Sequence, residues 1–279
     1  IMGTMITARL KGGLCNQMFQ LAAALGAAKN HNKDLVIDFN IIHHSGQGHP
    51  HKKYEDNLYK DIPRGQFKES KFVIYNEPHF HYTPIPDHED NMLIDGYFQS
   101  DKYFNKHRDD TIKLFHFSDE IQQSITSRID KIKNHFNKEQ TVCIHVRRGE
   151  YLKLPTIHTV QPKDYFVNSM KQFDVDNTVF IVISDDMKWC VENLNDNTVA
   201  FCNTGYDYDT EPVTDEFPEL YDLYLASQCD HNIISNSSFG WWGAWLNQNN
   251  NRVIAPKNWF GPDGPQDFYD VYCKGWEAI

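Results

Sequence analysis

The residues best suited to chemistry in this chain are the adjacent arginines of the stretch His145-Val146-Arg147-Arg148-Gly149-Glu150. They follow the apolar run 141–144, which predicts a buried strand with the arginines at its carboxyl end. Ligands of open α/β sheets bind at that end, and a guanidinium is a forked, permanently charged donor suited to phosphate. Because alternate strand residues share a face, His145 and Arg147 lie together and only one arginine needs to face a ligand. The alternative for this arginine is a structural ion pair.

A second predicted strand end carries two carboxylates. The run 178–184 ends at Ser184 and is followed by Asp185 and Asp186. A carboxylate at the carboxyl edge of a strand commonly accepts a ribose hydroxyl or the donor edge of a base, which suits Asp185. Asp186 is better placed to cap the next helix.

A third predicted strand, 231–235, runs into a turn that begins a helix. Hydroxyls and backbone N–H groups converge at such a turn, which favours a phosphate. The residues concerned are Asn236, Ser237, Ser238 and Phe239.

A glycine pair near the N-terminus forms a further candidate anion site. Gly12 and Gly13 separate a predicted strand from an Ala-rich helix, so backbone N–H groups and the positive end of the helix dipole would meet there. Asn16, at the helix start, suits either a cap or a ligand contact. The alternative is an ordinary tight turn.

Composition limits the class of protein. The 279 residues carry a formal net charge of −11, which argues against general nucleic-acid binding. The six cysteines are scattered, with no C-x-x-C pair, as expected for buried thiols in a reducing compartment. There is neither a long apolar run nor an apolar leader before the first predicted strand. We therefore expect no membrane span and a cytoplasmic protein, with an anchor outside this sequence as the alternative.

From residue 141 onward, predicted strands and helices alternate along the chain, which predicts a parallel, doubly wound sheet. The pattern breaks near 137–140, so we expect two Rossmann-like domains, 1–138 and 139–279, facing across a cleft. The predicted strands are 5–10, 35–39, 72–75, 92–94, 141–146, 178–184, 199–201, 231–235 and 252–255. One predicted helix, the Ala-rich one after Gly13, ends near residue 30. The other predicted helices span 118–136, 162–173, 187–194, 218–228 and 239–247.

Four motifs in this order give the chain a family resemblance. GGLCNQMFQLA, HVRRGEY, FIVISDD and ISNSSFGWWGAWL together resemble glycosyltransferase family 11, the α-1,2-fucosyltransferases. The resemblance implies a GT-B fold and inverting, metal-independent transfer without a cofactor. It also implies that GDP-β-L-fucose is held mainly by the C-terminal domain and that the acceptor is the 2-hydroxyl of a galactoside, on the side of the N-terminal domain.

The resemblance also implies residue roles. Arg147 matches the arginine on the donor pyrophosphate, with His145 beside it, and Asn16 matches an asparagine that reaches the donor from the other domain. The implied catalytic residues are Arg147, His145, Glu150 and Asn16. The implied donor-binding residues are Gly12, Gly13, Asn16, His145, Arg147, Ser184, Asp185, Asn236, Ser237, Ser238 and Phe239.

Two positions depart from the family pattern. Cys15 stands where a glycine is usual, which questions the backbone of that turn, and Glu150 stands where an aspartate is usual. A general base, if the reaction uses one, would be a carboxylate or histidine near the cleft, with Asp38, Asp95 and Glu150 as candidates.

Four alternatives stay open on the sequence. Asp207-Tyr208-Asp209 is a formal D-x-D, the metal–diphosphate clamp of metal-dependent transferases. A second alternative is a transferase of the same fold that uses another GDP-sugar as donor. A third is a non-catalytic glycan-binding protein. Finally, histidines are frequent between residues 43 and 88, but neither a helical H-x-x-x-H nor cysteine partners accompany them as a zinc site would require.

Overall fold

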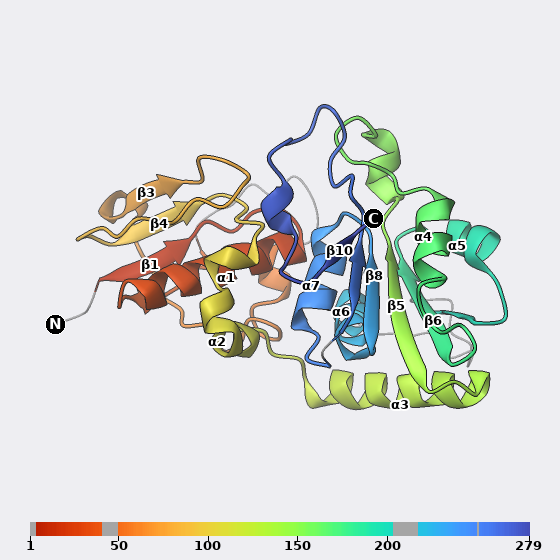
Figure 1. Ribbon diagram of the computed structural model, residues 1–279. Coiled ribbons are helices and arrows are strands. Elements are labelled where there is room, and N and C mark those ends of the chain that lie inside the picture. The colour runs from red at the N-terminus through yellow and green to blue at the C-terminus, as the bar shows by residue number, and fades with distance from the viewer. Residues whose placement is uncertain (1–3, 41–49, 203–216, 250) are drawn as a thin grey trace. The chain divides into compact units, whose positions relative to one another are not determined.

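The computed structural model describes residues 4–40, 50–202, 217–249 and 251–279 (Figure 1). The chain forms two compact units, the first made of Ile1–Ser118 with Asp267–Cys273 and the second of Asp119–Gln266 with Lys274–Ile279. Each unit contains one sheet in which every strand pairing is parallel. The predicted parallel α/β class is therefore confirmed.

The first unit is built on a four-stranded sheet of order β2-β1-β4-β3. Its strands are β1 (Met5–Ala8), β2 (Asp34–Leu35), β3 (Val73–Asn76) and β4 (Met92–Asp95). The predicted second strand is shorter than expected, because Ile37 forms only an isolated bridge with Arg64. The connection from β3 to β4 is irregular backbone without a helix.

Helix α1 (Leu14–Asn30) links β1 to β2 and lies in the interior of the first unit. Fourteen of its seventeen residues are buried, so its Ala-rich sequence serves close packing on all sides. Gly26 shows how close: a side chain there would collide with the backbone carbonyl of Tyr103. The unit also contains the short helix α2 (Arg108–Lys113).

The second unit is built on a six-stranded sheet of order β10-β9-β8-β5-β6-β7. Its strands are β5 (Gln140–Val146), β6 (Thr178–Ser184), β7 (Val199–Phe201), β8 (His231–Ile234), β9 (Val253–Ala255) and β10 (Glu277–Ala278). Strand β5 is central: it pairs with β6 along its whole length and with β8 on its other side. Six of the seven residues of β5 and all seven of β6 are buried, which matches the apolar residues that dominate both strands.

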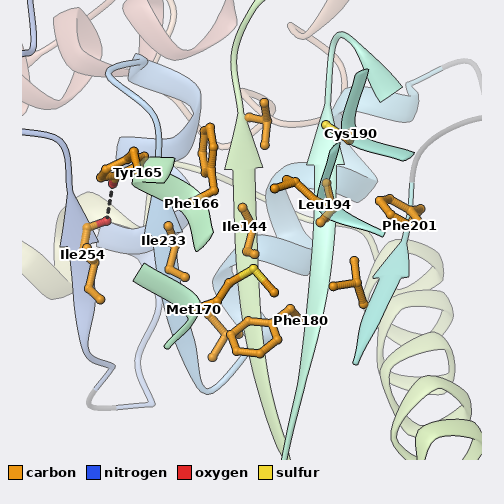
Figure 2. Packing of buried hydrophobic residues seen from close by; sticks show 14 of the residues in the cluster. Ile144, Tyr165, Phe166, Met170, Phe180, Cys190, Leu194, Phe201, Ile233 and Ile254 are labelled. Carbon is orange, nitrogen blue, oxygen red and sulfur yellow. Dashed lines mark hydrogen bonds between the residues drawn. The ribbon is translucent and has the colours of Figure 1, made fainter. Parts of the chain in front are cut away.

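Helices flank the second sheet. They are α3 (Asp119–Phe136), α4 (Lys163–Met170), α5 (Met187–Leu194), α6 (Pro218–Gln228) and α7 (Ser238–Leu246). Alternate residues of β5 and β6 face α4 and α5 in one apolar core, in which Ile144, Phe166 and Phe180 are fully buried (Figure 2). At its edge Tyr165 donates its hydroxyl to the carbonyls of Ile234 (2.7 Å) and Ile254 (3.2 Å), which fixes α4 on β8 and β9.

The division into units differs from the predicted boundary at residue 138 in two places. Helix α3, placed before that boundary, belongs with the second unit because its apolar stripe packs on α6 and β6. Residues 267–273, placed after it, belong with the first unit. There Asp270 Oδ2 accepts the backbone N–H of Tyr82 at 2.8 Å and Asp267 Oδ2 accepts that of His81 at 3.1 Å.

Most predicted elements have the expected type, and several have the expected bounds. Strand β6 and helices α5 and α6 match the predicted ranges completely, while α4 ends at Met170 rather than near residue 173. Strand β10 was not predicted, because two residues show no periodicity. Short 3₁₀ turns lie at His51–Lys53, Glu69–Lys71, Asp101–Tyr103, Asn105–His107, Gly149–Lys153 and Tyr269–Val271. Within the described residues, every helix is too short or too polar to cross a bilayer.

Candidate active site

The sheet order brings together the three strand ends that the sequence singled out. Strand β5 lies between β6 and β8, so Arg147, Asp185 and Ser235 follow three adjacent parallel strands. Two hydrogen bonds join the ends of β5 and β8: Ser235 N donates to His145 O at 3.1 Å, and Arg147 N donates to the side-chain Oγ of Ser235 at 3.1 Å. The carboxyl edge of the sheet thus gathers a cation, a carboxylate and a helix N-terminus at one place.

Arg147 is held from two sides and remains partly exposed. Its Nη1 lies 2.9 Å from Asp185 Oδ2, and its guanidinium lies 5.2 Å from the centre of the Tyr151 ring. The side chain keeps 31% of its surface exposed. The ion pair of the structural alternative is therefore present, but the guanidinium retains exposed surface for an anion.

Gly149 permits this arrangement. A side chain at Gly149 would collide with Asp185 Oδ2, so only glycine lets that carboxylate approach both arginines. Asp185 Oδ1 accepts the backbone N–H of Arg148 at 2.8 Å while Oδ2 meets Arg147. In this structure Asp185 positions the arginine, in addition to any contact with a nucleoside.

Arg148 has a different environment from its neighbour. Its Nε donates to Asp186 Oδ2 at 3.1 Å, and its guanidinium stacks 4.1 Å from the centre of the Trp189 ring. Asp186 in turn accepts the N–H of Trp189 and caps α5, as the sequence predicted. Of the two arginines, Arg148 therefore fastens α5 to the end of β5.

We expect Arg148→Ala to reduce stability more than ligand binding. Loss of the stacked, ion-paired guanidinium should lower the free energy of unfolding by about 1–2 kcal/mol. Affinity for GDP, the nucleotide that the family resemblance implies, should stay within about threefold of the wild type, a change below about 0.7 kcal/mol, because no ligand contact is lost. Chemical denaturation and calorimetry on the same preparation measure both quantities. A large loss of affinity with unchanged stability would contradict this assignment.

His145 is buried and neutral. Its ring stacks on Phe239 with centroids 5.3 Å apart, and its Nδ1 is buried without a hydrogen-bond partner, against Gly240 of α7. Burial, aided by the charge of Arg147, lowers the pKa of His145 to about 3. The side chain therefore adds no positive charge for a phosphate at neutral pH, and it sets the distance between β5 and the start of α7.

In the turn before α7, the side chain of Asn236 is used for internal hydrogen bonds, whereas Ser237, Ser238 and Phe239 lie at the start of the helix. Asn236 is buried: its Nδ2 donates to Trp259 O at 2.7 Å and its Oδ1 accepts from Gln161 at 3.0 Å. Ser237 is the N-cap of α7 and accepts the N–H of Phe239 at 3.3 Å. Ser238 and Phe239 are partly buried in the first turn. The amide of Asn236 is thus committed to packing, and the hydroxyls and N–H groups that follow it form the anion-suited end of the helix.

Tyr151 lies beside Arg147 in the candidate site, although no role was predicted for it from the sequence. Besides flanking Arg147, it donates its hydroxyl to Asn236 O at 2.9 Å and stacks on His158 with centroids 4.4 Å apart. Burial raises the pKa of Tyr151 to about 12, so it stays a neutral donor. Its position in the HVRRGEY motif was the available signal.

The predicted site residues of the first unit lie at the turn between β1 and α1. Gly12 has φ +77°, the left-handed region that favours glycine, and Gly13 is the N-cap of α1. Asn16 Oδ1 accepts from Gln99 Nε2 at 2.9 Å. Cys15 is a buried helical residue of α1 with no positive φ, so this position does not require glycine.

The candidate general bases have contrasting surroundings. Asp38 accepts the N–H groups of Asn40 and Phe67, and Asp95 forms ion pairs with Arg9 (2.9 Å) and Lys11 (2.8 Å). Both carboxylates are therefore engaged in the first unit. Glu150 is exposed in the 3₁₀ turn after the arginines.

Metal ligands do not gather in the part of the chain that the structure describes: no group of three or more His, Cys, Asp or Glu side chains is placed to hold an ion. Asp207 and Asp209 of the D-x-D, and His43, His44 and His49, lie outside the described residues.

The fold and the site define a class of protein. Two Rossmann-like units with parallel sheets form the GT-B fold of glycosyltransferases. The fold is similar to that of NodZ α-1,6-fucosyltransferase soaked with GDP-fucose, with a TM-score of 0.55, 15% identity, and coverage of 91% of this chain and 96% of that chain. The fucosyltransferase NodZ from Bradyrhizobium gives a TM-score of 0.53 at 14% identity, covering 86% of this chain and 92% of that one.

The sequence identifies the family. The profile of glycosyl transferase family 11 matches residues 2–279, and the chain belongs to this family. The O-antigen biosynthesis glycosyltransferase WbnK of Escherichia coli is 29% identical over 90% of this chain and 93% of its own. An α-1,2-colitosyltransferase of Escherichia coli is 26% identical over 99% of both chains. The galactoside 2-α-L-fucosyltransferase Sec1 of Mus musculus is 25% identical over 96% of this chain and 70% of its own.

Proposed function

We propose that this glycosyltransferase transfers L-fucose from GDP-β-L-fucose to the 2-hydroxyl of a galactoside, with inversion and without a metal ion. The observation that carries the proposal is Arg147, a partly exposed guanidinium held at the carboxyl edge of the sheet next to the strand that leads into α7. One relative is a galactoside 2-α-L-fucosyltransferase, and GDP-fucose was soaked into crystals of a protein of the same fold.

The chemical difficulty is the charge that builds on the leaving GDP as the bond from fucose C1 to the β-phosphate breaks. Arg147 would neutralise this charge with forked N–H donors, and the first-turn N–H groups after Ser237 would add the positive end of the α7 dipole. Asp185 and Tyr151 hold the guanidinium in place before the ligand arrives. As the bond from C1 to the phosphate oxygen breaks, the acceptor 2-hydroxyl oxygen bonds to C1 from the opposite face and gives up its proton to water or to a nearby carboxylate. Because the sugar is oxocarbenium-like at this point, the transfer needs little help from a base.

A second donor deserves testing because of the colitosyltransferase relative, which matches nearly the whole chain. Colitose is fucose without the 3-hydroxyl. A donor site that hydrogen-bonds this hydroxyl would reject the colitose donor strongly, whereas a site without such a contact would accept both. Competition between GDP-fucose and the activated colitose donor therefore decides between the two sugars.

Calorimetric titration in EDTA tests the donor class. We expect GDP to bind at least about tenfold more tightly than UDP or CMP, a difference of about 1.4 kcal/mol. Radiolabelled transfer to a terminal β-galactoside, followed by NMR of the product, then tests the linkage and anomeric configuration. Binding only in the presence of Mn²⁺, or a product linked at another hydroxyl, would refute the corresponding part of the proposal.

A further inference from the structure

The carboxyl edge of the first unit's sheet carries a second organised group of side chains, around Tyr97. Strand β4 lies between β1 and β3, so Lys11, Tyr97 and Glu77 follow three adjacent parallel strands. The N–H of Arg9 donates to Ile94 O at 2.9 Å and that of Glu77 to Asp95 O at 2.8 Å, which extends both pairings past the strands. Ligands of parallel sheets bind at this edge.

The loop that carries Tyr97 is fixed by one carboxylate. Glu77 accepts the backbone N–H of Tyr97 at 2.7 Å and that of Phe98 at 3.0 Å. Gly96 leaves room for Glu77, and Phe98 takes a positive φ of +52° while its ring is fully buried, edge-on against Tyr103. A strained residue of this kind persists only where its surroundings determine it. The result is that Phe98 points inward while Tyr97 is held outward.

Tyr97 is exposed, whereas most other aromatic side chains of the described residues are buried or half-buried. It has 41% of its surface exposed, and Tyr269 is the other aromatic residue among the exposed large apolar side chains of the described residues. The ammonium of Lys11 lies 5.1 Å from the centre of the Tyr97 ring and is itself fixed by Asp95. An aromatic ring with an apolar face and a wet rim is suited to the C–H face of a sugar.

Polar groups suited to hydroxyls lie in the same loop. Gln99, two residues after Tyr97, donates to Asn16 Oδ1 at 2.9 Å, so the two amides hold one another at the start of α1. Because this bond uses Gln99 Nε2 and Asn16 Oδ1, the Asn16 Nδ2 hydrogens and Gln99 Oε1 remain as a hydrogen-bond donor and acceptor for a ligand. A few convergent polar groups beside an apolar surface are the usual composition of a small-molecule site.

We propose that Tyr97 is the stacking platform for the hexopyranose ring of the acceptor, with the amide of Gln99 directed to its hydroxyls. Asn16, which the family resemblance assigns to the donor, holds Gln99 in place through their hydrogen bond. This inference rests on the proposed function, because the occupant is the galactoside that receives the sugar. It assigns acceptor recognition to Tyr97 and makes Gln99 a residue that determines acceptor specificity.

Steady-state transfer kinetics with Tyr97→Ala, Tyr97→Phe and Tyr269→Ala test the assignment. We expect Tyr97→Ala to raise the acceptor KM at least about tenfold while the KM for GDP-fucose stays within about twofold. Tyr97→Phe keeps the ring and should retain the acceptor KM. Tyr269→Ala removes a tyrosine of the same unit that is even more exposed, at 62%, and should also retain the acceptor KM. An unchanged acceptor KM in Tyr97→Ala would overturn the inference while leaving the proposed function intact.

A binding experiment separates failure of the platform from failure of the proposed function. The GDP-loaded full chain, labelled with 3-fluorotyrosine, is titrated with methyl β-D-galactoside and followed by ¹⁹F NMR, with Tyr97→Phe identifying the resonance. We expect the Tyr97 resonance to shift and that of Tyr269 to stay. If the wild type transfers no fucose but the Tyr97 resonance still shifts, the platform stands and the proposed reaction falls. No shift at saturating galactoside would overturn the platform.

Discussion

Arg147→Ala should lower the rate of sugar transfer at least about 100-fold, the range seen when one donor to a developing negative charge is removed. GDP affinity should fall as well, by about 1.5–3 kcal/mol for one charge-assisted contact. The physical reason is local. Arg147 has 31% of its side chain exposed at the carboxyl edge of β5, whereas the guanidinium of Arg148 stacks on Trp189 and pairs with Asp186.

Three comparisons make this result specific. Arg147→Lys keeps the charge but loses the planar fork, so its rate should lie between those of the wild type and Arg147→Ala. Tyr151→Phe removes the hydroxyl bonded to Asn236 O but keeps the ring beside the guanidinium, and should retain most of the activity. Thermal unfolding of all variants shows whether the fold is intact. Near-normal turnover in a folded Arg147→Ala protein would remove Arg147 from the mechanism.

Gly240→Ala is expected to lower both stability and donor affinity. A Cβ at this position would lie 2.7 Å from His145 Nδ1 and 3.2 Å from Ile234 Cβ, both in buried residues that cannot easily move. Such overpacking reduces the free energy of unfolding by about 1–3 kcal/mol. Because α7 must shift away from β5 and β8, the N–H groups of its first turn shift as well, and we expect GDP to bind at least about tenfold more weakly.

Gly243→Ala provides the matched control in the same helix. Its Cβ would lie 2.6 Å from Ala226 Cβ of α6, so it also overpacks a helix contact, but not the contact with His145. We expect a comparable loss of stability with GDP affinity close to that of the wild type. Denaturant unfolding and calorimetry of the two variants measure these effects. Equal losses of affinity in both would show that the position of α7 against His145 has no special role.

The sequence alone determined the local structure and the chemical inventory of this protein. The short apolar runs of β5 and β6, the capping Asp186 before α5 and the proline at the start of α6 fix these elements within short windows. The motifs also identified the family, which the profile match confirms over residues 2–279. The parallel topology of the second sheet followed as well, because the alternating strands and helices from β5 onward leave few other arrangements.

Tertiary structure alone decided how those residues are used. Strand alternation puts Arg147 and Arg148 on opposite faces, but it does not say what either side chain meets. The partners Asp185 and Trp189, brought in from the end of β6 and from α5, separate a partly exposed guanidinium from a stacked one. The same holds for Asn236, whose amide is engaged by Trp259 and Gln161, and for residues 267–273, which return to the first unit through Asp270. These outcomes depend on contacts between residues far apart in the chain, and sequence periodicity records only which residues are buried, not what they meet.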